Sequence, residues 1–333
     1  MVLELDGLKV DYLSASGVVH AVDGADLVVP EGQIVGLVGE SGCGKTTLAR
    51  AVTGVLAGNA RITAGRMMFR GRDLRTIGER AWRALRWREI AFVPQSAMNS
   101  LDPVYRVGAQ MMEVLIERGG YGRARARARA AELFELVGLD VARLDAFPHQ
   151  FSGGMRQRAA IALTLALEPK LIIADEPVTA LDVIVQRQVL DTLRSLQQRV
   201  GLSVSLVTHD ISVVAYLCDQ VAVMYAGRVV ESGPTTAVLT DPSHPYTMGL
   251  YNAFPDLERS KRVLTPIEGS PPDLRDPPSG CRFAPRCPFA IDDCAADPPV
   301  QRVGEAHVAA CWRVDQAPEL RRRAAEVTTW QRS

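Results

Sequence analysis

The sequence predicts an α/β protein built on a mostly parallel sheet, followed by a smaller segment of different composition. Buried-strand patterns alternate with helical patterns through most of the chain, which is the order expected of a parallel sheet covered on both faces. From about Thr240 this alternation stops, and 14 of the 20 prolines lie from Pro234 onward. We therefore expect two parts: residues 1–239, and a separate loop-rich module at residues 240–333.

The elements of the first part can be placed in order. Strands are expected at residues 3–12, 18–29, 33–38, 60–70, 90–93, 171–174 and 203–208, with a hairpin at 221–231. Helices are expected from Thr46, at 76–90, at 107–137, after Ser152 and at 183–200. Alternate arginines of the run RARARARA (123–130) lie about 200° apart on a helix, so they form no single basic stripe. We interpret this run as a solvated helix.

Composition excludes several classes of protein. The chain has 333 residues, 38 Lys+Arg against 38 Asp+Glu, and 47% hydrophobic residues. Zero net charge argues against a protein held mainly by nucleic-acid phosphates, and the hydrophobic content argues against long disorder. No run approaches the ~20 apolar residues that span a bilayer. The first ten residues contain no basic segment, so we expect no secretory signal there.

A glycine-rich phosphate-binding motif follows the strand expected at 33–38. Residues 39–46, Gly39-Glu40-Ser41-Gly42-Cys43-Gly44-Lys45-Thr46, match G-x-x-x-x-G-K-[ST] and open a helix. Its glycines let backbone N–H groups face phosphate oxygens at a helix N-terminus. Lys45 is expected to reach the β/γ-phosphates, and the Thr46 hydroxyl to bind Mg²⁺. Cys43 has two interpretations, an oxidisable thiol activated by these N–H dipoles or a small residue that fills space.

A second acidic site ends the apolar strand LIIADEP (171–177). Asp175 and Glu176 stand at its carboxyl end, where open α/β sheets bind ligands. Asp175 would hold Mg²⁺, and Glu176 would orient and polarise an attacking water. Alone, the pair could be a strand ending in a solvated turn; together with the phosphate loop it indicates an active site.

Further motifs resemble those of the ATP-binding cassette (ABC) family over residues 1–235. FSGGMRQR (151–158) is similar to the family signature, with Phe151 and Met155 in place of the usual leucine and glutamine. The other matching residues are Gln95 (Q-loop), Ala180-Leu181-Asp182 (D-loop), His209 (switch histidine) and Tyr12 (adenine-stacking aromatic). The resemblance implies a RecA-like parallel sheet core, an antiparallel β subdomain and a helical subdomain at about 96–158.

The resemblance also implies a mechanism in which two cassettes enclose two ATP molecules head to tail. One site would use Tyr12, Gly39, Ser41, Gly42, Cys43, Gly44, Lys45, Thr46, Thr47, Gln95, Asp175, Glu176, Asp182 and His209 of this chain. Gln95, with Thr46 and Asp175, would contact Mg²⁺. Ser152, Gly153 and Gly154 would contact the γ-phosphate held by the partner cassette.

The last hundred residues resemble a narrower group, the ATPase subunits of oligopeptide and dipeptide importers. The resemblance rests on His244-Pro245-Tyr246-Thr247 and GCRFAPRCP (280–288). It implies di- or oligopeptide uptake, with nickel or glutathione as alternative substrates. It also implies a second, non-identical ATPase, two membrane permease subunits, an extracytoplasmic peptide-binding protein, and a place at the cytoplasmic face of the membrane.

In such an importer, residues after Gln95, about Ser96–Gln110, would contact the permeases. The competing class is a soluble, non-transport ABC ATPase. Such proteins usually carry coiled-coil arms, zinc-finger insertions or fused cassettes, and none of these is visible in the sequence.

Four cysteines are spaced C-x₅-C-x₆-C-x₁₆-C in this segment: Cys281, Cys287, Cys294 and Cys311. Disulfides are disfavoured in a reducing cytosol, and structural zinc prefers C-x₂₋₄-C intervals. Four thiolates on widely spaced loops suit an iron–sulfur cluster, and the family resemblance also points to [4Fe–4S]. Zinc remains the alternative. Cys218 is expected to be a buried packing residue.

Overall fold

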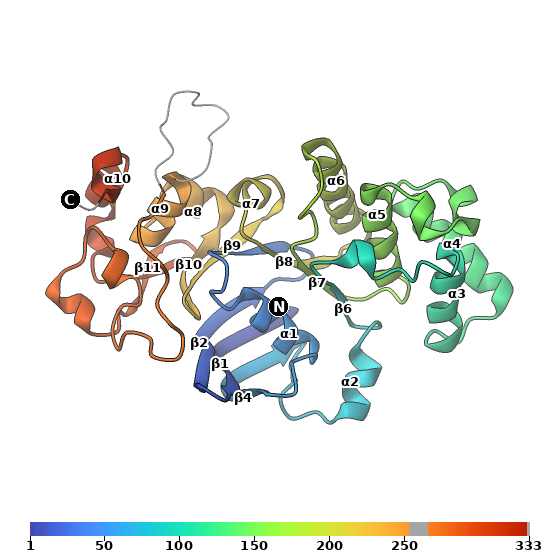
Figure 1. Cartoon of the computed structure of the whole chain (residues 1–333), viewed down its shortest axis with the longest axis horizontal. Coiled ribbons are helices and arrows are strands. Elements are labelled where there is room, and N and C mark those ends of the chain that lie inside the picture. The colour runs from blue at the N-terminus through green and yellow to red at the C-terminus, as the bar shows by residue number, and fades with distance from the viewer. Residues whose placement is uncertain (253–265, 332–333) are drawn as a thin grey trace.

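A computed structural model describes residues 1–252 and 266–331 and contains two sheets (Figure 1). The smaller sheet is antiparallel, in the order β2-β1-β4-β5. Its strands are β1 (Leu3–Ser14), β2 (Gly17–Val29), β4 (Ala60–Phe69) and β5 (Arg72–Asp73). This sheet corresponds to the antiparallel β subdomain that the family resemblance implies.

The larger sheet has the order β11-β12-β10-β9-β3-β8-β7-β6, and its central strands are parallel. They are β3 (Ile34–Val38), β6 (Ile90–Val93), β7 (Leu171–Asp175), β8 (Ser203–Thr208) and β9 (Gln220–Tyr225). Every residue of β3, β7 and β8 is buried, which explains the apolar runs of β3 and of Leu171–Ala174 in β7. The carboxyl ends of these strands therefore present their following loops along one edge of the sheet.

Side chains of β3 alternate between two hydrophobic clusters, one on each face of the sheet. Val35 and Leu37 join the cluster that includes the antiparallel sheet and α1 (Lys45–Thr53). Ile34 and Val38 join the larger cluster, to which a different set of helices contributes. Those helices include α3 (Val107–Glu117), α4 (Arg123–Leu136), α5 (Gly153–Thr164), α6 (Val183–Val200) and α7 (Ile211–Leu217). The short helix α2 (Glu79–Leu85) follows β5.

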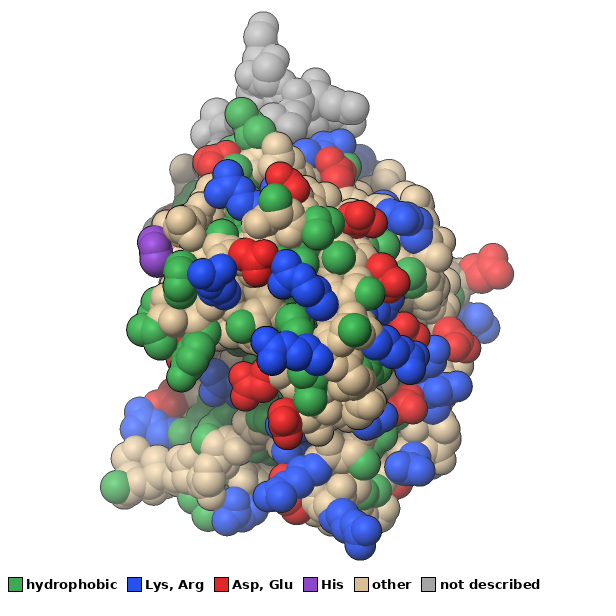
Figure 2. All heavy atoms as spheres, turned by 90° about the vertical axis from the view of Figure 1, so that its right-hand side faces the viewer, with side chains coloured by type: hydrophobic (Ala, Val, Ile, Leu, Met, Phe, Trp, Pro, Cys, Tyr) green, Lys and Arg blue, Asp and Glu red, His purple; other side chains and the backbone are tan. Residues whose placement is uncertain are grey.

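The helical segment expected at 107–137 is two helices, α3 and α4, separated by glycines at 119, 120 and 122. In α4, Ala126 and Ala130 are buried one turn apart, whereas the arginines are mostly exposed, so the interpretation as a solvated helix is confirmed. On the face that carries α3 and α4, basic and acidic side chains are interspersed (Figure 2).

The C-terminal segment, of which residues 240–252 and 266–331 are described, is joined to the cassette through the large sheet. Strand β12 (His307–Ala310) pairs with β10 (Arg228–Pro234), and β11 (Val300–Gly304) extends the sheet by one more strand. The segment thus adds two strands to the large sheet, whereas the division into domains at residues 239 and 240 stays a prediction. One edge of β10 pairs with β9, and β12 supplies the hydrogen-bond partners that the backbone groups on the other edge need.

The short helix α8 (Thr235–Thr240) leads into this segment, whose described residues include the helices α9 (Pro245–Asn252) and α10 (Ala317–Ala324). The expected boundary at residue 239 falls inside α8. Pro245 begins α9 and Pro318 lies in the first turn of α10, positions at which proline is tolerated because no helical N–H is lost. Within the described parts of the chain, no helix combines the length and apolar character needed to cross a membrane.

Candidate functional site

The glycine-rich loop lies tightly against neighbouring backbone. A Cβ added to Gly39 would lie 2.0 Å from the Met224 carbonyl oxygen, and one added to Gly44 would lie 2.1 Å from that of Ala21. Gly44 also has φ 108°, a conformation that disfavours other residues, and it caps helix α1. The sequence therefore needs glycine at both ends of the loop, and the loop leads directly into the helix N-terminus.

Lys45 and Thr46 stand at that N-terminus. The buried Lys45 ammonium donates to the carbonyl oxygens of Gly39 and Glu40, at 2.7 and 2.8 Å. The Thr46 hydroxyl donates to Oδ1 of Asp175 at 3.3 Å, so α1 and the end of β7 meet as the motifs predict. Burial raises the pKa of Asp175, and the adjacent Glu176 carboxylate raises it further. A cation bound here would favour its charged form.

Glu176 is the centre of a hydrogen-bonded group at the same sheet edge. Gln95 Nε2 donates to its Oε2 at 2.6 Å, His209 Nδ1 lies 2.8 Å from its Oε1, and Thr179 Oγ1 donates to Oε2 at 3.1 Å. Burial acts to raise the pKa of Glu176, but these three partners, His209 foremost, bring the pKa below its usual range. The carboxylate is therefore ionised at neutral pH and can accept a proton.

Thr179 was not identified from the sequence. It lies three residues after Glu176, and its backbone N–H donates to the Glu176 carbonyl in a tight turn. The sequence contains one signal for this contact, a hydroxyl residue three positions after Glu176. That signal is weak, because threonine is common in turns that have no catalytic role.

Tyr12 lies beside the helix that follows the loop. Its hydroxyl oxygen is 3.4 Å from Oγ1 of Thr47, so strand β1 brings an aromatic side chain next to the nucleotide-binding motif. This placement is compatible with the stacking role that the resemblance assigns to Tyr12.

The signature and D-loop residues form a second group. Ser152 caps α5 by accepting the Met155 N–H at 3.3 Å, and Asp182 caps α6 by accepting the Val185 N–H at 3.0 Å. A Cβ on Gly154 would lie 2.1 Å from Val185, so the starts of the two helices pack together. Among the residues that the structure describes, no hydrogen bond joins Ser152, Gly153 or Gly154 to the glycine-rich loop.

The two remaining cysteines of the cassette are buried. Burial raises the pKa of the Cys43 thiol, although Lys45 acts in the opposite direction. This direction favours the interpretation of Cys43 as a small residue that fills space over that of an activated thiol. Cys218 ends α7 in the hydrophobic core, where burial raises its pKa as well, so its expected packing role is confirmed.

The four C-terminal cysteines line one small cavity and form no disulfide. Burial raises the pKa of Cys287 to about 12 and that of Cys311 to about 11, and raises that of Cys281 as well. Across residues 1–252 and 266–331, however, no group of three or more His, Cys, Asp or Glu side chains is arranged to hold a metal ion. The structure thus brings Cys281, Cys287, Cys294 and Cys311 to one place without supporting the expected cluster or zinc.

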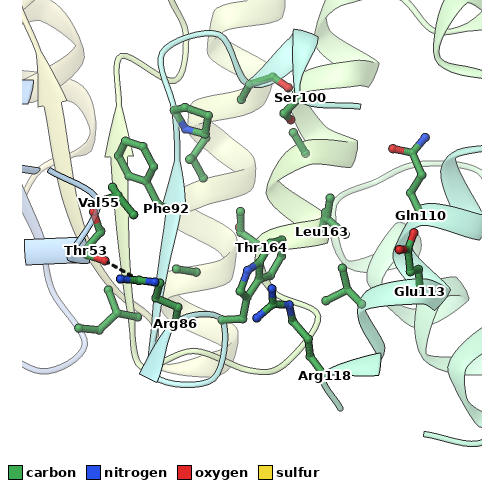
Figure 3. A pocket seen from close by; sticks show the side chains of 18 of the residues that line it. Thr53, Val55, Arg86, Phe92, Ser100, Gln110, Glu113, Arg118, Leu163 and Thr164 are labelled. Carbon is green, nitrogen blue, oxygen red and sulfur yellow. Dashed lines mark hydrogen bonds between the residues drawn. The ribbon is translucent and has the colours of Figure 1, made fainter. Parts of the chain in front are cut away.

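A large cavity of about 980 Å³ lies between the sheet and the helical subdomain (Figure 3). Strand β6, the loop after Gln95, α3 and α5 contribute its lining. Its lining includes apolar side chains such as Phe92 and Leu163 alongside charged Glu113 and Arg118. The labelled Arg86 donates to the Thr53 carbonyl oxygen at 3.3 Å.

Two sequence families match the chain. The family described as ABC transporter matches residues 22–179, and the oligopeptide/dipeptide transporter C-terminal region matches residues 230–294. The solved dimer of the ATP-binding cassette MJ0796 bound to ADP and Pi is 27% identical, with a TM-score of 0.62 over 70% of this chain and 98% of that one. The fold and the connected site thus define a P-loop ATPase of the cassette type.

Relatives extend the match to nearly the whole chain. The dipeptide transport ATP-binding protein DppD of Bacillus subtilis (strain 168) is 41% identical over 96% of each chain. The oligopeptide transport ATP-binding protein OppD of Salmonella typhimurium (strain LT2) is 42% identical over 94% of each. The chain belongs to the ABC transporter family, in its oligopeptide and dipeptide transport group.

Proposed function

We propose that this chain is the ATP-hydrolysing subunit of an importer of di- or oligopeptides. The observation that carries the proposal is the connected site at one sheet edge, where Lys45, Thr46 and Asp175 adjoin Glu176. The names of the relatives supply the peptide substrate class.

Each residue of the site has a separate role in phosphoryl transfer. Lys45 exchanges its two carbonyl partners for phosphate oxygens, and Thr46, Asp175 and Gln95 provide oxygen ligands for Mg²⁺, which neutralises phosphate charge when bound. Glu176 orients the attacking water and accepts its proton. His209 holds the Glu176 carboxylate and contacts the γ-phosphate.

A second cassette completes each site in this proposal. The first two residues of α6, Val183 and Ile184, leave 82% and 74% of their surface exposed beside the signature and Asp182. Exposed apolar side chains next to the signature glycines support a protein interface here. The family resemblance implies that the partner is a non-identical homologue. Ser152, Gly153 and Gly154 of this chain would contact the nucleotide that the partner binds.

Two permease subunits and an extracytoplasmic peptide-binding protein complete the importer, with this chain at the cytoplasmic face of the membrane. The cavity shown in Figure 3 is the proposed docking site for a cytoplasmic helix of a permease. It supports this assignment because Val104 and Tyr105, within the expected segment Ser96–Gln110, are exposed apolar residues and Tyr105 lines the cavity. Gln95, which immediately precedes this segment, links the docking site to Glu176 through a hydrogen bond.

We also propose that the cysteine cavity holds a [4Fe–4S] cluster with a structural role. Zinc at about 2.3 Å from each sulfur would need the four thiolates about 3.8 Å apart, whereas a cluster spreads them over four separate irons. What supports the cluster over zinc is the wide C-x₅-C-x₆-C-x₁₆-C spacing of four thiols that line one cavity. Iron and sulfide analysis after anaerobic purification tests this; stoichiometric zinc without iron refutes it.

The test of the main proposal is reconstitution of the chain with its permeases, partner ATPase and binding protein in proteoliposomes. We expect peptide to stimulate ATP hydrolysis and to accumulate inside in an ATP-dependent way. Stimulation by Ni²⁺ or glutathione in place of peptide would reassign the substrate. Failure of the chain to copurify with any membrane subunit would favour the soluble class of ABC ATPase.

A further inference from the structure

Among the described residues, side chains of the C-terminal segment form hydrogen bonds with Glu40 of the glycine-rich loop. The Glu40 backbone N–H donates to the Tyr246 hydroxyl at 2.9 Å. The Arg286 guanidinium donates to both carboxylate oxygens of Glu40, at 2.7 and 3.0 Å. Tyr246 and Arg286 belong to the two sequence motifs, HPYT and CRFAPRC, to which the ATPase mechanism gives no role.

Both contacting side chains are themselves held in place. Arg286 is buried, donates to the Tyr225 hydroxyl and to the carbonyl oxygens of Glu268 and Ile267, and lies over the Tyr225 ring. Tyr246 is fully buried, with its ring centroid 4.6 Å from that of Tyr225. Because packing and hydrogen bonds hold Tyr246 and Arg286 in place, these side chains can in turn hold Glu40 in one position.

Glu40 is therefore held on three sides. Tyr246 binds its N–H, Arg286 binds its carboxylate, and Lys45 binds its carbonyl oxygen. The loop around it contains three glycines between 39 and 44, which have more backbone freedom to lose than other residues. A loop ordered before the ligand arrives does not lose that freedom on binding, so affinity rises.

We propose that Tyr246 and Arg286 are positioning residues that hold the glycine-rich loop in its nucleotide-binding conformation through Glu40. The C-terminal segment thereby sets the affinity of the ATP site. The proposal deepens the function proposed above and rests on it. Arg286 immediately precedes Cys287, so the loop contact and the cysteine cavity share one stretch of chain.

The test measures Mg-ATP binding by the full-length chain with a fluorescent ATP analogue, and KM and kcat in the reconstituted complex. Tyr246→Phe removes only the hydroxyl, and Arg286→Met keeps the length of the side chain without its charge. We expect each to raise Kd and KM for ATP about 5- to 20-fold, with kcat at saturating ATP changed less than about twofold. Arg286→Lys retains the charge with one bond and should fall between wild type and Arg286→Met.

A double-mutant cycle tests whether Arg286 acts through Glu40. If it does, Glu40→Gln combined with Arg286→Met weakens binding no more than about twofold beyond the stronger single variant. If the fold-changes in Kd of the two single variants multiply in the double variant, Arg286 and Glu40 act independently. That result would overturn the proposal that Arg286 acts through Glu40.

Two matched controls separate positioning from general destabilisation. Tyr216→Phe removes a hydroxyl that is bonded to Asp191 on the surface, and Asp297→Asn breaks an ion pair of 2.6 Å with Arg228, another contact between the C-terminal segment and the large sheet. Both should leave the Kd for ATP unchanged.

The proposal is overturned if Tyr246→Phe and Arg286→Met bind ATP as wild type does, or if the controls weaken binding equally. It is also overturned if Arg286→Met lowers Tm while its folded fraction keeps wild-type affinity. A wild-type chain that binds no nucleotide would instead refute the proposed function, so the two failures are distinguishable.

Discussion

Glu176 is the residue on which the chemistry of this site depends. Its backbone has φ 49°, in the left-handed region, and its carboxylate is held by three partners from three different segments of the chain. Such a conformation in a non-glycine residue costs free energy, which the surrounding contacts offset. A carboxylate fixed in this way and kept ionised is suited to orient a water molecule and accept its proton.

Thr179 supplies the least obvious of these partners. In Thr179→Val the carboxylate loses one of three hydrogen bonds while the side-chain shape is kept, so we expect kcat to fall about 3- to 10-fold with unchanged Kd for ATP. Steady-state kinetics and nucleotide titration check this. Thr192→Val is the control, because Thr192 is a partly buried threonine whose hydroxyl donates to the Gln188 carbonyl; we expect no change in kcat or Kd. Full activity in Thr179→Val would contradict the role.

At this scale the sequence is informative where functional residues are contiguous or belong to a motif. Lys45, Thr46, Asp175 and Glu176 could be assigned because their spacing matches a known chemical need. Thr179 could not, since its function depends on a turn that only the folded chain defines. The sequence also leaves two interpretations of Cys43, because the direction of its pKa shift depends on burial, which the motif does not reveal.

The starts of α5 and α6 form the element that faces the proposed partner cassette. Ser152 caps α5, so Ser152→Ala should cost about 1 kcal/mol of stability, as N-cap losses generally do. Because the same hydroxyl would serve the partner's γ-phosphate, we expect hydrolysis by the assembled complex to fall at least tenfold, well beyond the effect on stability.

Asp140→Ala is the matched control, because Asp140 caps the short turn Val141–Asp145 away from the signature. It should lower Tm by a similar amount and leave hydrolysis intact. Thermal unfolding and ATPase assays of both variants check the prediction. Equal loss of activity in the two variants would show that Ser152 acts only as a helix cap.

Elements of the cassette were predicted more accurately than those of the C-terminal segment. The helix at 183–200 and the strand at 203–208 match α6 and β8 because they combine clear periodicity with adjacent turn signals. Strands β11 and β12 are short, and β12 pairs with β10, more than 70 residues earlier in the chain, while β11 pairs with β12. Their formation depends on that distant edge, which local pattern does not encode.

Across the whole molecule, Asp23 joins parts that are distant in sequence. It pairs with Lys9 of β1 at 2.8 Å, with Arg228 of β10 at 3.1 Å, and with the buried Arg282 of the C-terminal segment. Burial acts to raise the pKa of Asp23, but these cations lower it to about 2. The charged carboxylate therefore stabilises the junction between the antiparallel sheet, the large sheet and the C-terminal segment.

The pKa of Asp23 sets a pH-dependent prediction. Because it is lowered from 3.8 to about 2, its stabilisation is complete above about pH 5 and is lost as pH falls from about 4 to about 2. Asp23→Asn should lose on the order of 2 kcal/mol of unfolding free energy at pH 7, with the gap to wild type shrinking over that acidic range.

Urea unfolding at several pH values checks this prediction. Asp6→Asn, at an exposed ion pair with Arg66, should change stability by less than about 0.5 kcal/mol. A gap between Asp23→Asn and wild type that stays constant down to pH 2 would show that the carboxylate charge does not stabilise the junction.

The central claim is that the Glu176 site hydrolyses ATP. The most direct test measures ATP hydrolysis and Mg-ATP binding in parallel for wild type and Glu176→Gln in the reconstituted complex. We expect the variant to keep its Kd for ATP within about twofold and to lose at least about 100-fold in kcat, because the amide cannot accept the proton of the attacking water. Hydrolysis by the variant within a few-fold of wild type would contradict the assignment.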